Sequence, residues 1–347
     1  MDKLKTAVLG LNEDGLALLK AAGSLEYYEI VAVADKDAGL AETIALEYKC
    51  APFDDYRQLI IQNQLDCLIV AAGLHTCDEY VRMAMKKKAN ILKVPPPARN
   101  FEELAEFYRL AEAENVKFAI ANSFRFTKSF QEFKDYWQNQ TSENIYLILV
   151  SCIFGQTNQP LWYSDPVLAG GGVLLRNSYF IIDLLIDTFN LPEQVYSLNT
   201  NMAADKKQRQ YLTEDIAVAT MKFSETTFCN ITAARNAPFG KPEQSITVYT
   251  KDKIISVNQE KFTIKDSFGK SLSQSNRDNS ISNCNSKMLE NFAQNILSPQ
   301  EDTLFGSIKN NLQNMALIEA AYVSARTGLP EKPGKILTLT TLNFKDL

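Results

Sequence analysis

Short apolar segments alternate with amphipathic segments along the first third of the chain. The apolar segments have the length of strands buried on both faces, and they lie at residues 7–9, 30–34, 67–72, 90–93 and 117–121. The segments between them carry apolar side chains at helical spacing, most clearly at residues 38–48, 56–62, 76–87 and 101–114. This order of strands and helices predicts a doubly wound parallel sheet that ends near Asn122.

The pattern changes after Asn122. Segments rich in β-branched and aromatic residues predict a mostly antiparallel sheet, at residues 145–153, 194–200, 216–223, 228–234, 245–250, 253–257 and 261–264. Helices are predicted at residues 130–139, 172–188, 287–296 and 306–326, and the polar residues 269–285 predict a mobile loop. The predicted fold class is α/β, with an N-terminal Rossmann domain (residues 1–122) and a C-terminal α+β domain (residues 123–347) built on a large, mostly antiparallel sheet.

The first strand ends in a turn typical of dinucleotide-binding proteins. In the motif G-x-G-x-x-G the first glycine makes the turn, the second admits the pyrophosphate, and the third lets helix and strand pack closely. Gly10 and Gly15 occupy the first and third positions, and Asn12 replaces the second. Asp35 follows at the end of the second strand, where an acid holds the ribose hydroxyls. With Leu11, these residues form the candidate cofactor-binding set.

Two interpretations of this turn are open. Asparagine tolerates a positive φ, so Asn12 is compatible with a retained cofactor site. Glu13 and Asp14, however, complement the helix dipole themselves and repel an incoming anion, which favours a turn that caps its own helix and binds nothing. Asp35 favours retained binding, and it favours NAD over NADP because a carboxylate repels a 2′-phosphate. Lys36 beside it opposes that preference.

Composition and charge describe an ordinary soluble protein. Of the 347 residues 46% are hydrophobic and 22% are charged, and the net charge of −5 argues against a nucleic-acid partner. The lysine run at residues 86–88 is interpreted as a solvated helix end. No apolar stretch reaches the ~20 residues of a membrane span, and the chain enters its first strand at once, so a cytoplasmic location without a membrane partner is expected. Six scattered cysteines predict neither a zinc site nor a disulfide framework.

His75 is the only histidine in the sequence. A histidine-dependent triad elsewhere in the chain, and any metal site with several histidine ligands, are therefore excluded. His75 follows a buried strand at the start of a predicted helix, where a cap or a packing residue is commoner than a catalytic acid.

Several motifs together resemble the Gfo/Idh/MocA family of nicotinamide-dependent oxidoreductases along nearly the whole chain. Each motif is weak alone, but their order and spacing are specific. Besides the first strand, turn and helix they are VAVAD (residues 31–35), VAAGLH (70–75), ILKVPPPA (91–98), NSFRF (122–126), DPVLAGGGVLL (165–175) and YVSARTGLP (322–330). The resemblance implies an NAD cofactor, with NADP as the alternative, a small-molecule ligand, and a homodimer or homotetramer formed through the C-terminal sheet. It also places Ala72 and His75 beside the cofactor.

The resemblance also shows which catalytic groups this chain lacks. Family members carry a lysine in E-K-P, and an Asp and a His four residues apart after G-G-G, as the proton relay that accompanies hydride transfer. Pro95 stands at the lysine, Arg176 at the aspartate and Phe180 at the histidine. The chain therefore resembles a divergent member without the usual relay.

Three neighbouring side chains are candidates for a replacement relay. Lys93 lies two residues before Pro95 and would point to the same side of an extended strand. Tyr179 and Asp183 lie one and two helical turns beyond Arg176. Each also has a structural interpretation: Lys93 as a solvated strand end, Tyr179 as a packing residue and Asp183 as a partner for another group.

Arg176 places a base where the resemblance implies an acid. A buried guanidinium needs either an internal carboxylate, for which Asp183 is the candidate, or an anionic ligand. Arg176, Lys93 and Arg125 form the candidate substrate-binding set. Two functions remain open. One is an oxidoreductase with an altered relay acting on a sugar, cyclitol or related small molecule, neutral or anionic, and the other is a catalytically inactive binding, sensor or partner protein.

Overall fold

The computed structural model describes residues 3–140, 144–155, 160–201, 212–237, 242–276, 280–298 and 304–339. The chain forms two compact units, each of which is described here by itself. The first comprises Met1–Ala98, Glu103–Phe126 and Ser280–Lys309, and the second comprises Arg99–Glu102, Thr127–Asn279 and Asn310–Leu347. The segment Ser280–Lys309 thus packs with the first unit, whereas the sequence pattern predicts it in the second domain.

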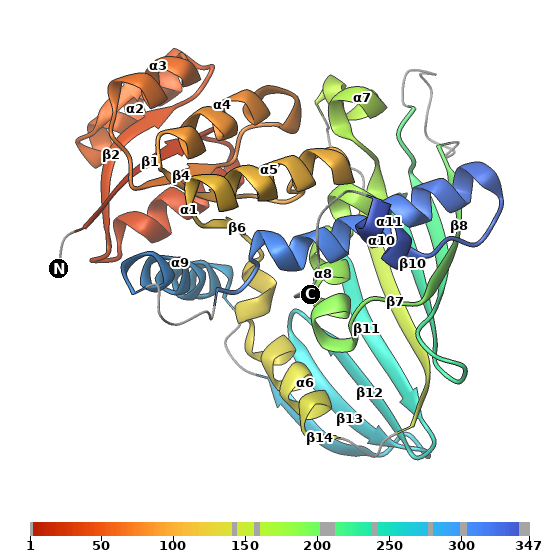
Figure 1. The fold of residues 1–347 in the computed structure, drawn as a ribbon. Coiled ribbons are helices and arrows are strands. Elements are labelled where there is room, and N and C mark those ends of the chain that lie inside the picture. The colour runs from red at the N-terminus through yellow and green to blue at the C-terminus, as the bar shows by residue number, and fades with distance from the viewer. Residues whose placement is uncertain are drawn as a thin grey trace. The chain divides into compact units, whose positions relative to one another are not determined.

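A six-stranded parallel sheet forms the centre of the first unit (Figure 1). Its spatial order is β3-β2-β1-β4-β5-β6, and the strands are β1 (Leu4–Leu9), β2 (Tyr28–Ala34), β3 (Ala51–Phe53), β4 (Cys67–Val70), β5 (Asn90–Lys93) and β6 (Phe118–Ile120). Between them run α1 (Glu13–Gly23), α2 (Ala38–Tyr48), α3 (Tyr56–Gln62), α4 (Leu74–Lys86) and α5 (Phe101–Glu114). The predicted doubly wound parallel sheet is confirmed.

Helix α9 (Ile281–Leu297) belongs to this unit and packs beside α1 (Figure 1). The prediction of a mobile loop over residues 269–285 is wrong, because β14 (Ser271–Asn276) and the start of α9 occupy most of it, while residues 277–279 lie outside the described part. Ser280 caps the helix, and Cys284, Met288 and Phe292 put apolar side chains into the core at helical spacing. Polar residues on the other face hid this periodicity.

The lysine run at the end of α4 is not simply solvated. The Lys87 ammonium donates to the carbonyls of Ile60, Ile61 and Asn63 at 2.6, 3.0 and 3.2 Å, at the carboxyl end of α3. The Lys88 ammonium donates to the Glu114 carbonyl at the end of α5. These lysines therefore satisfy carbonyl groups that two helix ends leave without an intrahelical partner.

The second unit is built on an eight-stranded sheet of order β14-β13-β12-β11-β7-β10-β9-β8. Its other strands are β7 (Ile145–Gly155), β8 (Gln194–Thr200), β9 (Ile216–Lys222), β10 (Phe228–Ala237), β11 (Glu243–Thr250), β12 (Lys253–Asn258) and β13 (Lys261–Asp266). Only the central β10 and β7 pair is parallel among the paired strands that the structure describes, so the predicted mostly antiparallel sheet is confirmed. The helices are α6 (Lys128–Gln138), α7 (Pro166–Ala169), α8 (Tyr179–Phe189), α10 (Ile308–Thr327) and α11 (Pro333–Leu339).

The helix predicted over residues 172–188 is interrupted at Ser178. Val173–Asn177 forms a π-helical turn, α8 begins at Tyr179, and the segments on either side of Ser178 are bent by 60°. The Ser178 hydroxyl and amide both donate to the Val173 carbonyl at 3.0 Å, which closes the wide turn. No single described helix is long and apolar enough to cross a membrane, and only this bent pair, taken together, meets such a criterion.

Candidate functional site

The turn after β1 requires both of its glycines. Gly10 has a φ of +92°, and a Cβ there would lie 2.5 Å from the Ala72 amide nitrogen. A Cβ on Gly15 would lie 2.0 Å from the Gly10 carbonyl oxygen. The turn therefore brings β1, the start of α1 and the end of β4 into contact, as the dinucleotide motif requires. The predicted cofactor residues Gly10, Gly15 and Ala72 meet at this point.

Asn12 closes this turn with its own side chain. Its backbone is extended, with a φ of −68°, so the predicted tolerance of asparagine for positive φ is not used. The Oδ1 atom accepts from the Gly15 amide at 2.9 Å, and the Nδ2 atom donates to the Ala71 carbonyl at 2.8 Å. The first of these bonds occupies one of the helix N-terminal amides that an anion would use. Exposed Glu13 and Asp14 add two carboxylates in the same helical turn.

Asp35 lies at the carboxyl end of β2 beside the same turn. Its carboxylate accepts from the Leu11 amide at 2.7 Å and from the Asp37 amide at 3.0 Å, one bond on each oxygen. Each carboxylate oxygen has two acceptor positions, so both can still accept a ribose hydroxyl. Lys36 places its ammonium 4.8 Å from the centroid of the Tyr56 ring. The residues present therefore fit the adenosine ribose of a dinucleotide, whereas the Asn12 side chain occupies space and one amide where the pyrophosphate would bind.

His75 is exposed in the first turn of α4, close in sequence to buried Ala72 at the end of β4. The carboxyl ends of parallel strands form the ligand-binding edge of such a sheet. Exposure rules out the interpretation of His75 as a core packing residue. Its predicted place beside a cofactor stays a prediction.

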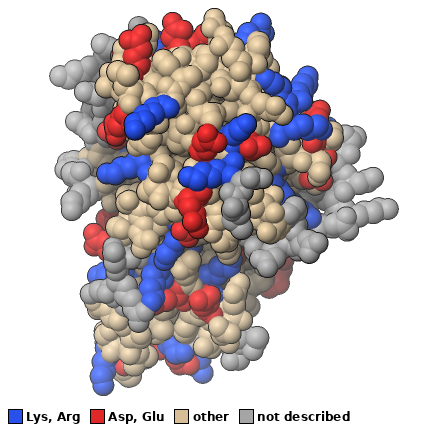
Figure 2. Space-filling model, turned by 90° about the vertical axis from the view of Figure 1, so that its left-hand side faces the viewer, with Lys and Arg blue, Asp and Glu red and all other residues tan. Residues whose placement is uncertain are grey.

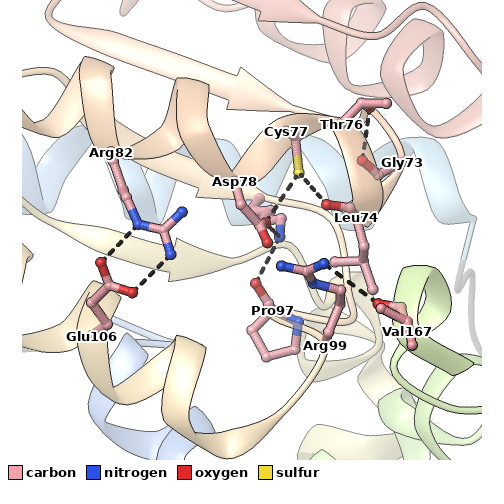
Figure 3. A network of polar contacts seen from close by, with 11 residues as sticks. Gly73, Leu74, Thr76, Cys77, Asp78, Arg82, Pro97, Arg99, Glu106 and Val167 are labelled. Carbon is pink, nitrogen blue, oxygen red and sulfur yellow. Dashed lines mark hydrogen bonds and ion pairs between the residues drawn. The ribbon is translucent and has the colours of Figure 1, made fainter.

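Lys93 is a buried structural cation of the first unit. Its side chain is 1% exposed, and its ammonium donates to the Pro97 carbonyl at 2.7 Å and lies 3.6 Å from Oδ1 of Asp78. Figure 3 shows Asp78 and Cys77 on α4 facing Pro97 around this point. Burial raises the pKa of the Cys77 thiol to about 11, while the Lys93 charge acts in the opposite sense. This placement does not support Lys93 as a proton donor or a substrate ligand, nor its interpretation as a solvated strand end.

Tyr179 and Asp183 are committed to a polar chain inside the second unit. The Tyr179 hydroxyl donates to Oδ1 of Asn311 at 2.5 Å. The Asn314 amide donates to Oδ1 of Asp183 at 2.6 Å and to Asn311 at 3.3 Å. Both predicted relay residues are no more than 1% exposed. The structure therefore supports their structural interpretations, because both side chains are buried and hydrogen-bonded within the unit.

The other predicted positions are less informative. Pro95 and Phe180, which stand at two family relay positions, are partly buried and carry no titratable group. Arg125 is 8% exposed within the turn Ser123–Phe126 of the first unit and is not without an interaction partner. Its role as a substrate ligand stays a prediction.

The three consecutive glycines before Arg176 are explained by packing. Gly170 has a φ of +76°, and a Cβ there would lie 2.3 Å from the Arg99 carbonyl oxygen. A Cβ on Gly171 would lie 2.1 Å from the Tyr322 hydroxyl, and one on Gly172 would lie 2.0 Å from the Glu214 carbonyl oxygen. The backbone therefore approaches three other segments at van der Waals distance, which no residue with a side chain permits.

Glu214 anchors the turn that follows these glycines. Its buried carboxylate accepts from the amides of Gly172 and Leu174, at 2.6 and 3.0 Å, and from the Tyr322 hydroxyl at 2.7 Å. Burial raises the pKa of the Glu214 carboxyl, and the Tyr322 hydroxyl opposes that shift. The sequence analysis missed Glu214, because its partners are up to 108 residues away and no local pattern marks it.

Arg176 lies in a corner formed by two aromatic rings. Its guanidinium carbon is 3.5 Å from the centroid of the Tyr163 ring and 4.5 Å from that of Trp162. The two rings meet nearly at right angles, at 82° with centroids 4.3 Å apart. Both come from the short turn Leu161–Ser164, which the sequence analysis also missed, although a pair of adjacent aromatic residues ending seven positions before the glycines was a visible signal.

The Arg176 side chain has no ion-pair partner among the residues that the structure describes, and its Nε and Nη1 atoms are buried without a hydrogen bond there. Burial lowers the pKa of Arg176, Tyr163 acts in the opposite sense, and the charge of Arg235 lowers it further. Arg235 itself pairs with Asp215 at 2.5 Å. The predicted internal pairing of Arg176 with Asp183 is therefore not found in the described residues.

On the face of the molecule seen in Figure 2, basic and acidic side chains lie interspersed and form no patch of one sign. The described residues contain no group of three or more His, Cys, Asp or Glu side chains arranged to hold a metal ion. Within the described ranges, Arg176 is thus a charged side chain with two buried nitrogens that lack a hydrogen-bond acceptor.

Two family models match the chain. One, the oxidoreductase family's NAD-binding Rossmann fold, matches residues 4–122, and the other, the C-terminal alpha/beta domain of the same family, matches residues 143–331. Both carry the Gfo/Idh/MocA designation, so the resemblance seen in the motifs is confirmed. No curated protein matches the sequence significantly.

Solved structures of oxidoreductases share the fold along nearly the whole chain. An inositol dehydrogenase homologue from Azotobacter vinelandii, complexed with NAD+, has a TM-score of 0.85 at 15% identity and covers 95% of this chain and 97% of its own. An Agrobacterium radiobacter oxidoreductase with NAD+, L-tartaric acid and magnesium has a TM-score of 0.81 at 16% identity, covering 96% and 100%. The WlbA dehydrogenase from Bordetella pertussis, with NADH and UDP-GlcNAcA, has a TM-score of 0.77 at 17% identity, covering 95% and 99%. At these identities the likeness establishes the fold alone.

Proposed function

The chain belongs to the Gfo/Idh/MocA oxidoreductase family, and from that premise we propose that it binds NAD(H) and a sugar, cyclitol or related small molecule without the family's usual proton relay. Neighbours in the fold are solved with NAD+ or NADH, and they include dehydrogenases of inositol and of nucleotide sugars. The motif residues of the first unit support the binding of NAD(H). The side chains at the relay positions support the absence of the usual proton relay.

Cofactor binding would use the edge formed by β1, β2 and β4. Gly10 and Gly15 shape the turn, Asp35 accepts the hydroxyls of the adenosine ribose, and Ala72 lines the end of β4. The Asp35 carboxylate selects NAD over NADP, because it would face the 2′-phosphate of NADP at close range. Asn12, Glu13 and Asp14 weaken the contact with the pyrophosphate.

The observation that carries the catalytic half of the proposal is the commitment of Tyr179 and Asp183 to Asn311 and Asn314. A bound nicotinamide supplies or accepts a hydride, and the reacting hydroxyl must then lose or gain a proton. With Pro95 and Phe180 at family relay positions and the replacement candidates buried, no described side chain at those positions is placed to move that proton. One positioned acid or base contributes roughly 10²- to 10⁴-fold, so turnover of simple polyols falls at least that far below the family norm.

A second candidate function is supported by His75. It is a titratable side chain exposed in the first turn of α4, near the sheet edge where ligands bind in this fold class. In this alternative the protein is an active oxidoreductase, and His75 exchanges the proton that the missing lysine would have exchanged.

The large sheet supports an assembly of identical chains. Its solvent-facing side carries exposed apolar side chains on four neighbouring strands, namely Leu149, Tyr196, Leu198, Val218 and Phe228. A face of this kind is unusual on a monomer. We propose that the protein is a homodimer or homotetramer that buries this side.

Titration of the purified protein with NADH and with NADPH, followed by nicotinamide fluorescence, tests the cofactor proposal. We expect NADH to bind, and NADPH to bind more weakly. Absence of binding by both at millimolar concentration would contradict it. Incubation with NAD+ and myo-inositol or glucose, followed at 340 nm, then separates the two functions: negligible turnover supports the binding protein. Turnover that His75→Asn abolishes, without loss of NADH binding, supports the enzyme.

A further inference from the structure

We propose that the aromatic corner around Arg176 is a carboxylate-binding subsite, so that the small molecule bound by this protein is an acid of the sugar or polyol class. The inference deepens the proposed function and rests on its small-molecule half. Its starting point is a charged side chain with buried donors and no described acidic partner.

The corner leaves two nitrogens of the Arg176 guanidinium without a hydrogen-bond acceptor among the described residues. The guanidinium carbon of Arg176 lies 3.5 Å from the centroid of the Tyr163 ring and 4.5 Å from that of Trp162, and because the two rings stand at 82° to each other its flat face can stack on only one of them. Stacking uses the π faces of the rings and of the guanidinium. It does not use the N–H groups, which lie in the guanidinium plane and point outward along its edges. Nε and Nη1 are buried and unbonded among the described residues, so two donors of the guanidinium still lack an acceptor.

The local charge favours an anion. Desolvation lowers the pKa of Arg176, the Tyr163 hydroxyl opposes that shift, and the charge of Arg235 lowers the pKa further. The ion pair between Arg235 and Asp215, at 2.5 Å, offsets the Arg235 charge but leaves that of Arg176. Asp183, the acid that could have neutralised Arg176, is held by Asn314. A ligand carboxylate would supply the missing charge and the missing acceptors together.

A carboxylate fits this edge better than a neutral hydroxyl. Its two oxygens are coplanar and accept parallel N–H bonds from a guanidinium, and such charge-assisted bonds are about twice as strong as neutral ones. In a site that already excludes water from two nitrogens, the exchange of a hydroxyl for a carboxylate should tighten binding about 10- to 100-fold. The neutral parent would leave the buried charge without a partner.

The test compares D-glucuronate with D-glucose, and D-glucose 6-phosphate with both, by isothermal titration of the full chain with and without NAD+. We expect glucuronate to bind about 10- to 100-fold more tightly than glucose, and Arg176→Gln to remove that preference. Arg176→Lys keeps the charge but loses the planar fork, so it should retain less than a tenth of the wild-type affinity for glucuronate. Arg326→Gln is the matched control, because it removes the same charge from an arginine whose side chain is 69% exposed, and it should leave the preference unchanged.

Equal affinities of the wild type for glucuronate and glucose overturn the inference, and so does a preference that survives Arg176→Gln. A stronger preference for glucose 6-phosphate than for glucuronate overturns the carboxylate assignment. The wild-type comparison needs no variant, so a poorly folded Arg176→Gln protein cannot hide a negative result. If neither NADH nor NADPH binds but glucuronate is still selected through Arg176, the cofactor proposal fails and this inference stands.

Discussion

The Asp183 carboxylate accepts a hydrogen bond from the side-chain amide of Asn314 at 2.6 Å, although Arg176 lies only two helical turns before it in the sequence. The expected pairing required one continuous helix with both residues on the same face. The π-helical turn and the 60° bend at Ser178 rotate Arg176 away from that face. A single local irregularity thus separates a cation from its nearest acid in the sequence and leaves it facing two aromatic rings.

Tyr179→Phe should lower stability without a specific effect on chemistry. The substitution removes the hydroxyl that donates to Oδ1 of Asn311 at 2.5 Å and leaves that oxygen the Asn314 amide at 3.3 Å, so we expect a loss of about 0.5–1.5 kcal/mol, the contribution of one hydrogen bond. Urea unfolding measures this loss. Tyr163→Phe, which removes a hydroxyl from a partly exposed ring, is the comparison. Unchanged stability together with lost turnover would instead identify Tyr179 as a catalytic residue.

Lys93→Met should be strongly destabilising. It leaves the Asp78 carboxylate in a buried site without the ammonium 3.6 Å away, and breaking such a pair from one side costs about 3–5 kcal/mol. Lys93→Met combined with Asp78→Leu should be less damaging than the sum of the single changes, because no uncompensated charge remains. Lys88→Met removes a lysine whose side chain is 64% exposed and should cost far less. A mild effect of Lys93→Met would contradict the structural role.

Asn12→Gly should tighten NADH binding by about 2- to 10-fold, the equivalent of one released hydrogen-bond donor. The change frees the Gly15 amide from Oδ1 of Asn12 and removes a side chain beside the pyrophosphate. Asn12→Ser keeps a helix-capping oxygen and should bind NADH as the wild type does. Fluorescence titration of the three proteins checks the order, and equal affinities for Gly and Asn would show that the cap does not limit binding.

Glu214→Gln should change how stability depends on pH. Burial raises the pKa of the folded-state carboxyl above its ordinary value of 4.5, so ionisation is harder in the folded protein than in the unfolded chain. The stability contribution of this group is therefore fully present below pH 4.5 and is lost as the pH rises through the folded pKa. We expect the unfolding free energy of the wild type minus that of Glu214→Gln to fall as the pH rises over that interval. Urea unfolding from pH 4.5 upward, with exposed Glu225→Gln as the control, measures it; a difference that grows with pH would contradict the assignment.

If the proposed homo-oligomer forms through the large sheet, Leu198→Asp should reduce it to monomers without unfolding the chain. The side chain is 60% exposed on β8, so a charge there costs little in an isolated chain but much in a buried interface. Light scattering coupled to size exclusion gives the mass of each species. Phe268→Asp, at a residue 95% exposed in a hairpin turn, is the control. A wild type that is already monomeric at micromolar concentration would end the proposal of an oligomer.

Strong local periodicity explains why most of the fold was predictable. Buried strands such as CLIV and helices such as α5 can be predicted from the pattern of a few neighbouring residues, and the G-x-x-x-x-G spacing identifies the first turn. Gly10 and Asp35 could be identified as candidate cofactor residues from this spacing as well. The candidate site was less predictable, because the partners of Lys93, Asp183 and Glu214 are chosen by tertiary packing and lie on elements that sequence spacing does not connect. The start of helix α9 was missed because five of its first six side chains are polar or small, so that tertiary contacts rather than an amphipathic pattern define where it starts.

The return of α9 to the first unit has a consequence for vectorial synthesis. The ribosome delivers β1 to β6 first, but the helix that covers α1, and whose Leu289 carbonyl receives the Tyr28 hydroxyl at 2.6 Å, emerges only after the whole eight-stranded sheet has been made. Until then the nascent amino-terminal part exposes an apolar surface that its own residues cannot bury. A fragment ending at Phe126 should therefore be aggregation-prone and need chaperones to stay soluble. Co-expression of this fragment with a peptide of residues 280–309 should restore its solubility. The first unit can therefore complete its folding only after the strands of the second unit have been synthesised.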